Sequence, residues 1–219
     1  YVAQKLLKGA IGTNNFDANS RLCMSSAVAG YNRSFGSDGP PCCYEDIDHC
    51  SLILLIGTNT AECHPVLFDR IKKRKRNVND NLKVIVIDPR ETETSSIADF
   101  YLQISSGTDL FSFIGIANYL YKNQLTDQSF IDKSTESYFH FVKHLQKWDL
   151  KKISEICNIP EKTIIDIAKL WGESKNVLSL WSMGLNQRQE GTAAVNGLIN
   201  IHLMTGQIGK EGSGPFSLT

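Results

Sequence analysis

The sequence predicts a doubly wound α/β fold, and three observations lead to this prediction. Two runs, 51–57 and 83–88, are apolar without alternation, which is typical of strands buried on both faces of a parallel sheet. Segments with a helical period of apolar residues follow each run. The 219 residues, of which 42% are hydrophobic, can form one substantial core. We therefore expect a single Rossmann-like α/β domain over residues 1–219, with a mainly parallel sheet and helices on both faces.

Further elements are expected around these two runs. The stretches 101–104 and 177–181 are weaker strand candidates. Segment 124–160 is rich in Lys, Asp, Ser and aromatic residues, and we expect it to form a helical excursion outside the sheet. The expected helices have faces formed by Cys63, Leu67 and Ile71; by Leu110, Phe113, Ile114, Ala117 and Tyr121; by Ile164, Ala168 and Trp171 after Pro160; and by Val195, Leu198, Ile199 and His202 before Gly206.

Charge and hydropathy argue against two classes of partner. Lys and Arg number 23, and so do Asp and Glu, which gives no electrostatic reason to expect nucleic acid or a membrane surface. No apolar run approaches the roughly 18 residues of a membrane-spanning helix. The chain starts at Tyr1, in a segment with helical character and without a Met. We interpret it as an internal fragment of a larger protein.

The cysteine pattern indicates free thiols. Six cysteines occur without a Cys-x-x-Cys pair, so the sequence predicts neither a zinc site nor an iron–sulfur cluster within this stretch. The adjacent Cys42 and Cys43 favour reduced thiols over a disulfide framework. This pattern favours a reducing compartment such as the cytoplasm.

Three segments follow expected strands, where open parallel sheets bind their ligands. Gly57–Glu62 offers amide groups to a pyrophosphate, and Asp88–Thr92 places an acid where a ribose diol is often bound. In Gly107–Asp109, the carboxylate could accept hydrogen bonds from N1–H and the N2 amino group of a guanine. Each segment also has a simpler interpretation as a turn or a helix cap. Together they favour a nucleotide-like ligand, although the Gly-x-Gly-x-x-Gly motif of nicotinamide sites is missing.

Longer motifs carry a family resemblance along nearly the whole chain. The segment 19–28 resembles the metal-ligand segment of the oxidoreductases that bind molybdenum through two molybdopterin guanine dinucleotides. The segment 35–46 resembles their assimilatory nitrate reductase branch. The likeness continues through 57–65, 88–92, 107–109, 181–187 and 215–219.

The resemblance implies a role for each matching position. Cys23 would be the thiolate ligand of molybdenum, since a soft sulfur donor suits this metal; otherwise it is a small buried hydrophobe. Asn19 would form a hydrogen bond to the cofactor, while Met183 and Gln187 would approach the pterin, although Met183 is equally well explained as a core residue. The residues implied to wrap one dinucleotide arm are Ile56, Gly57, Thr58, Asn59, Thr60, Ala61, Glu62, Cys63, Asp88, Pro89, Arg90, Glu91, Thr92, Gly107, Thr108 and Asp109.

Met24 indicates the substrate. Formate dehydrogenases that resemble this segment usually carry a proton-accepting His after the metal ligand, and Met cannot take a proton. The resemblance therefore implies reduction of nitrate to nitrite in nitrate assimilation. It also implies a [4Fe–4S] cluster outside this chain, an electron donor such as ferredoxin, and the remaining domains of the parent enzyme, without which the fragment is expected to be inactive.

Two other functions stay open on the residues alone. One is a formate dehydrogenase-like molybdoenzyme, and the other is an isolated guanine-nucleotide-binding module, for which Cys23 would have no use. Arg188, directly after Gln187, could attract an anion to the metal, but a solvated surface arginine is the interpretation that we favour.

Overall fold

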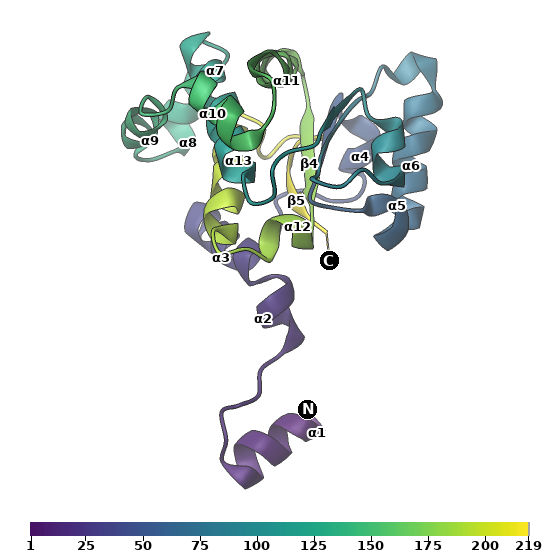
Figure 1. Ribbon diagram of the computed structural model, residues 1–219, viewed down its shortest axis with the longest axis vertical. Helices are drawn as coiled ribbons and strands as arrows, with labels where there is room; N and C mark the ends of the chain where they lie inside the picture. Colours follow the sequence, from purple (N-terminus) through teal and green to yellow (C-terminus); the bar gives the residue numbers. More distant parts are fainter. Residues whose placement is uncertain (219) are drawn as a thin grey trace.

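The computed structural model of the protein describes residues 1–218, so Thr219, the last residue of the carboxy-terminal motif, lies outside the described residues. Its centre is a parallel sheet of five strands in the order β3-β2-β1-β4-β5 (Figure 1). The strands are β1 (Leu52–Ile56), β2 (Lys83–Ile87), β3 (Phe100–Leu102), β4 (Val177–Trp181) and β5 (Gly214–Ser217). The doubly wound parallel fold expected from the sequence is thus confirmed.

The strand order creates a switch point beside β1. The chain proceeds from β1 through β2 to β3 on one side, and then returns to place β4 on the other side of β1. Ile56 is in register with Ile87 and with Trp181, so that β1, β2 and β4 end at the same level. In open sheets this position, beyond the carboxyl ends of strands that diverge, is where ligands bind.

Helices cover both faces of the sheet because the central strands are apolar on both faces. Leu54 and Ile56 belong to one core, which they share with α3 (Ser25–Phe35), α7 (Asp109–Lys122), α11 (Glu161–Glu173) and α13 (Gly191–Met204). Ile53 and Leu55 point into a second core with α4 (Asp46–His49) and α6 (Pro65–Arg76). All five residues of β1 are fully buried, which explains the continuous apolar run in the sequence.

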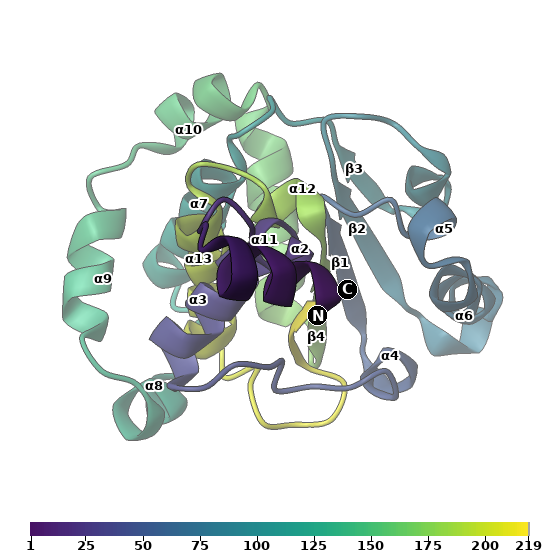
Figure 2. The ribbon, with the colours of Figure 1, turned by 90° about the horizontal axis from the view of Figure 1, so that it is seen from below.

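The segment between α7 and α11 consists of three helices outside the sheet. These are α8 (Gln128–Ser134), α9 (Tyr138–Leu145) and α10 (Leu150–Cys157), and both α9 and α10 contact α7. Figure 2 shows them on the far side of α7 and α13 from the strands. This arrangement leaves the carboxyl ends of the strands uncovered by the excursion.

The amino-terminal segment extends away from the sheet. A short helix α1 (Val2–Gln4) continues into a π-helix (Lys5–Ile11), and α2 (Asn19–Cys23) leads back to the body of the molecule (Figure 1). Tyr1, Leu6 and Ile11 are exposed there. Among residues 1–218, no helix combines the length and the apolar character needed to cross a membrane.

The structure differs from the expectation at two elements. The expected helix through Cys63 is divided into α5 (Thr60–Cys63) and α6, because Pro65 starts a new helix; Cys63 is exposed, and Phe68 and Ile71 form the buried face. The edge strand β5 was not predicted. It contains Pro215, which is compatible with an edge position, and Tyr31 links it to α3, because the phenol accepts from Ser217 N at 2.9 Å and donates to Pro215 O at 3.2 Å.

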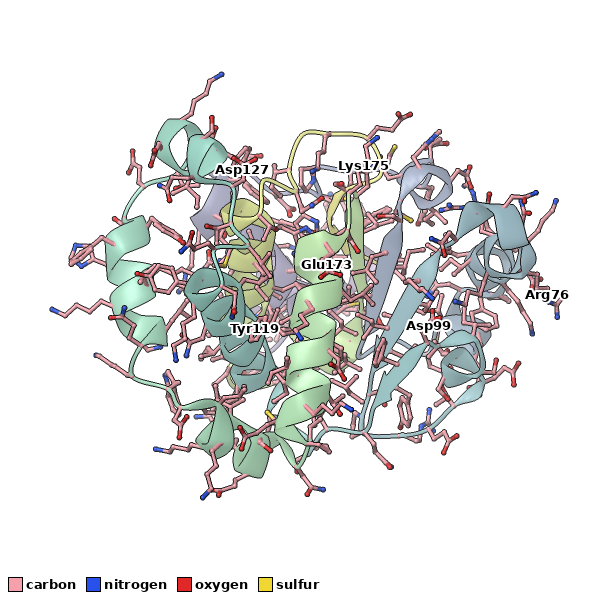
Figure 3. All side chains as sticks on the ribbon, turned by 90° about the horizontal axis from the view of Figure 1, so that it is seen from above. Arg76, Asp99, Tyr119, Asp127, Glu173 and Lys175 are labelled. Atoms are coloured by element: carbon pink, nitrogen blue, oxygen red, sulfur yellow. The ribbon has the colours of Figure 1, made fainter. Side chains whose placement is uncertain are left out.

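Polar contacts tie the start of β3, where Asp99 is labelled in Figure 3, to β2 and α6. Asp99 directly precedes β3, and its carboxylate accepts a hydrogen bond from Val84 N in β2 at 2.8 Å and pairs with Lys75 and Lys83. Two short 3-10 helices, Val78–Asp80 and Glu93–Ile97, flank β2. The remaining helix, α12 (Met183–Asn186), lies at the opposite, carboxyl end of the sheet, directly after β4.

Candidate functional site

The loops after β1 and β4 touch through two glycines at the switch point. Gly184 N donates to Gly57 O at 2.9 Å, and the Ser182 hydroxyl donates to the same oxygen at 3.3 Å. A Cβ on Gly57 would lie 2.7 Å from the carbonyl carbon of Gly184, and one on Gly184 would lie 2.6 Å from Gly57 Cα. Gly57 also has a φ of +53°, in the left-handed region. Only glycine fits at both positions, and backbone forms this part of the surface.

A hollow of about 460 Å³ lies between these loops and the ends of β2 and β3. It brings together side chains and backbone from four segments that are far apart in the sequence. The residues that line it are Gly57, Asp88, Pro89, Ser106, Gly107, Met183, Gly184, Gln187 and Arg188. Six of these, Gly57, Asp88, Pro89, Gly107, Met183 and Gln187, were predicted as site residues from the sequence.

Other predicted residues after β1 and β2 do not line the hollow. Thr58 and Thr60 are buried, with their hydroxyl oxygens 3.2 Å apart. Thr94 connects the two loops, since its hydroxyl donates to Asn59 Oδ1 at 3.0 Å and accepts from Ala61 N at 3.1 Å. The side chain of Ile56 lies in the core, and Glu62, Cys63, Arg90 and Glu91 are exposed. Thr92 Oγ1 accepts a hydrogen bond from Thr94 N, as expected of a helix cap. Asp88 Oδ1 accepts one from Arg90 N, as expected of a turn.

The carboxylate at the start of α7 is engaged by an arginine. Asp109 is 1% exposed, Thr108 precedes it as the N-cap residue of the helix, and the Arg188 guanidinium forms an ion pair with Asp109. Arg188 also donates from Nε to Gly184 O, and its side chain is only 15% exposed. The prediction of a solvated surface arginine is therefore wrong: the buried carboxylate draws the guanidinium inward. Burial raises the pKa of Asp109 above its ordinary value, and the charge of Arg188 opposes this shift.

The segment with the predicted metal ligand lies beside a second hollow. Cys23 ends α2 and Ser25 starts α3, so that Met24 forms a non-helical junction with φ −124° and ψ 2°. Cys23 has a free, half-buried thiol, and Asn19 is exposed at the start of α2. The hollow has a volume of about 490 Å³ and is lined by Arg21, Leu22, Ser25, Ser26, Asn186, Gln187, Arg188 and Gln189. Gln187 and Arg188 line both hollows, which connects the metal-ligand segment to the strand ends.

One buried residue that lines the second hollow was missed in the sequence. Asn186, the last residue of α12, donates from Nδ2 to Cys23 O and to Met24 Sδ, both at 3.4 Å. Its Oδ1 accepts from Trp181 Nε1 at 3.1 Å, and its carbonyl accepts from the Ser26 hydroxyl at 2.7 Å. Asn186 belongs to the motif 181–187, and this motif was the only feature of the sequence that could have pointed to it. Its amide has no chemistry of its own, and only the contacts reveal its position.

Comparisons with known proteins agree with this arrangement. A "Nitrate reductase" of Synechocystis is 54% identical over all 219 residues of the chain, and the match spans 30% of that protein. A "Nitrate reductase" of Klebsiella oxytoca is 42% identical over the whole chain and 25% of its own length. A "Periplasmic nitrate reductase" of Desulfovibrio desulfuricans is also 42% identical, over 30% of its length. The chain thus spans less than a third of these relatives.

A solved structure supports the fold. The acetylene hydratase from Pelobacter acetylenicus superposes with a TM-score of 0.81 over 93% of this chain and 27% of that chain. At 21% identity this likeness concerns the fold alone. The sequence profile named molybdopterin oxidoreductase matches residues 1–219, which is the entire chain. The chain therefore belongs to the molybdopterin oxidoreductase family.

Proposed function

We propose that this chain is the cofactor-binding domain of a nitrate reductase, and that the complete protein reduces nitrate to nitrite with a molybdenum–pterin cofactor. The observation that carries the proposal is the identity of 54% and 42% to nitrate reductases over the whole length of the chain. Family membership implies the molybdenum–pterin group itself. Its form as a bis(molybdopterin guanine dinucleotide) is part of the proposal.

The residues of the site fit such a group. Two adjoining hollows of about 460 and 490 Å³ share Gln187 and Arg188, which suits an elongated ligand. Glycines at 57 and 184 keep the backbone close to the first hollow, where no side chain fills the space. Cys23 supplies a free thiol next to the second hollow, and thiolates are suitable ligands for a soft or high-valent metal.

The chain's own residues have distinct tasks in this proposal. Cys23 is the metal ligand, and Asn19 bonds the cofactor from the same segment. The backbone of 56–63 and the residues 88–92 and 107–109 bind one dinucleotide arm, in which Asp88 serves the ribose. Asp109 serves the guanine once its ion pair with Arg188 opens, because that pair buries the carboxylate. Met183 and Gln187, which line the first hollow, contact the pterin.

The reaction sets requirements for the residues around Cys23. Two-electron reduction of nitrate, with loss of one oxygen atom, is the chemistry that the molybdenum–pterin group supplies when it is bound. Two protons are consumed with the two electrons, and one water is released. The thioether of Met24 can neither donate nor accept a proton. Met24 therefore keeps this position free of a base, and the protons come from another source.

The remaining components belong to the complete protein. We propose that electrons arrive from a donor such as ferredoxin through a [4Fe–4S] cluster outside this chain, and that the other domains enclose the metal. We also propose a cytoplasmic location, on the six free thiols, although one relative is named periplasmic.

The test uses the full-length protein that contains this chain. Nitrate and formate turnover are measured with a reduced or oxidised viologen dye, together with the molybdenum content, for the wild type, Cys23→Ala and Cys43→Ala. Cys43 is an exposed free thiol and serves as the matched control. We expect nitrite formation to be lost in Cys23→Ala and retained in Cys43→Ala. Full activity of Cys23→Ala would refute the metal-ligand role, and formate oxidation by the wild type would refute the interpretation of Met24.

A further inference from the structure

The contacts of Asn186 form a continuous path from the sheet to the Cys23–Met24 junction. Trp181 is the last residue of β4 and is fully buried against Tyr31, with ring centroids 5.7 Å apart. Its indole N–H donates to Asn186 Oδ1 at 3.1 Å. The amide nitrogen of Asn186 then donates to Cys23 O and Met24 Sδ. The buried carboxyl end of β4 is thereby linked to the peptide next to the predicted metal ligand.

The orientation of the Asn186 amide is determined by its neighbours. An indole N–H can only donate, so the amide oxygen has to face Trp181 and the amino group has to face the junction. Both atoms on the junction side, a carbonyl oxygen and a thioether sulfur, are acceptors. Among the side chains of this size, only Asn accepts on one side and donates twice on the other. Asp has no donor when ionised, and Leu has neither a donor nor an acceptor.

The junction needs such a tether because the helix is interrupted there. Met24 leaves the helical conformation between α2 and α3, and α2 has no buried residue of its own to hold it on the core. The Ser26 hydroxyl provides a second, separate attachment, through the main-chain carbonyl of Asn186. Asn186 is 3% exposed, so its bonds compete little with water.

From these contacts we propose that Asn186 is a positioning residue, which fixes the Cys23 peptide and turns the Met24 thioether away from the substrate position beside Cys23. The bond to Met24 Sδ holds the side chain toward α12, and Met24 packs on the core there. This inference rests on the proposed function for its catalytic consequence, but the tether itself is a property of the chain.

The first test measures the junction without any cofactor. In cofactor-free full-length protein, the rate of Cys23 alkylation by iodoacetamide is followed by mass spectrometry, with Cys43 as an internal standard. We expect Asn186→Leu to change the Cys23 rate several-fold while the Cys43 rate stays the same. Ser26→Ala removes only the main-chain attachment and should leave the Cys23 rate near that of the wild type. Asn186→Ser, which is smaller and uncharged, replaces Asn186→Leu if the latter does not fold. An unchanged Cys23 rate in a folded variant would overturn the tether.

The second test separates the roles of Met24 and Cys23 during turnover. In the loaded enzyme we expect Asn186→Leu to lower kcat/KM for nitrate about tenfold or more, since small displacements of a positioned group have effects of this size. The Mo(V) electron paramagnetic resonance signal should change at an unaltered molybdenum content. In a Met24→Leu background, the same substitution should have a smaller effect. Equal effects in both backgrounds would overturn the role of the thioether. A wild type without nitrate turnover would refute the proposed function, whereas the alkylation result would still decide on the tether.

Discussion

The ion pair between Arg188 and Asp109 is buried, and this burial decides how the pair affects stability. The two side chains are 15% and 1% exposed. A buried carboxylate without a cation is costly, whereas the pair as a whole adds little to stability compared with apolar residues. The pair joins the start of α7 to the loop after α12, so it also holds together the two sides of the first hollow.

The first prediction concerns Arg188→Met. Burial already raises the pKa of Asp109, and loss of the guanidinium raises it further. When the pKa of a carboxyl is higher in the folded than in the unfolded protein, the folded protein loses stability as the pH rises from the unfolded to the folded pKa. The variant should therefore be less stable than the wild type by about 3 kcal/mol at pH 8, and by clearly less near pH 4.

Urea unfolding of the chain at both pH values checks this prediction. The double variant Asp109→Asn/Arg188→Met is the control, because it removes the charge that the single variant leaves unpaired, and it should recover much of the loss at pH 8. An equal loss at the two pH values would show that the interaction is not one of charge.

Which site residues could be predicted depended on their chemistry. Cys23 and the strand-end glycines and acids are recognisable in the sequence, because their residue types and positions after apolar runs point to ligands. The location of Asn186 depends on a contact between residues 163 positions apart, which a single sequence does not encode locally. The burial of Arg188 was misjudged for the same reason, since Asp109 is brought beside it only by the packing of α7 against α11 and α13.

At the scale of elements, the continuous apolar runs were the most informative feature. They predicted β1 and β2 within one residue, because strands buried on both faces need no alternation. The weaker candidate 177–181 coincides with β4. The run 101–104 indicated β3 only approximately, and β5 was missed because Gly214 and Pro215 are unfavourable in strands. Tertiary contacts stabilise β5: it pairs with β4, and Tyr31 bonds its backbone.

A second prediction concerns the contact between the β1 and β4 loops. Gly184→Ala places a Cβ 2.6 Å from Gly57 Cα and from Gly57 O. Both neighbours are backbone atoms that cannot rotate away, so we expect a loss of stability of about 2 kcal/mol. Urea unfolding measures this, with Gly9→Ala as the matched control.

The control distinguishes a clash from a general effect of replacing glycine. A Cβ on Gly9 meets no atom within 4 Å, and Gly9 lies in the π-helix Lys5–Ile11. Gly9→Ala should therefore be neutral or stabilising by about 0.5 kcal/mol. Similar losses for both variants would contradict the close approach of the two loops.

At the scale of the whole molecule, the order of the strands in the sheet determines where the site lies. The three strands β1, β2 and β4 end at one level beside the switch point, and the loops that follow them surround the first hollow. The second hollow adds the Cys23 segment, which reaches this edge from the amino-terminal side of the chain (Figure 2). The sequence predicted the layers and the strand-end loops, but the meeting of the two hollows at Gln187 and Arg188 required the three-dimensional arrangement.

The most direct test of the central claim is X-ray absorption at the molybdenum edge of the full-length protein, for the wild type, Cys23→Ser and Cys43→Ser. If Cys23 is the metal ligand, Cys23→Ser loses one sulfur neighbour of the metal or fails to retain molybdenum, while Cys43→Ser keeps the wild-type spectrum. A Cys23→Ser protein with full molybdenum content and an unchanged sulfur shell would contradict the account.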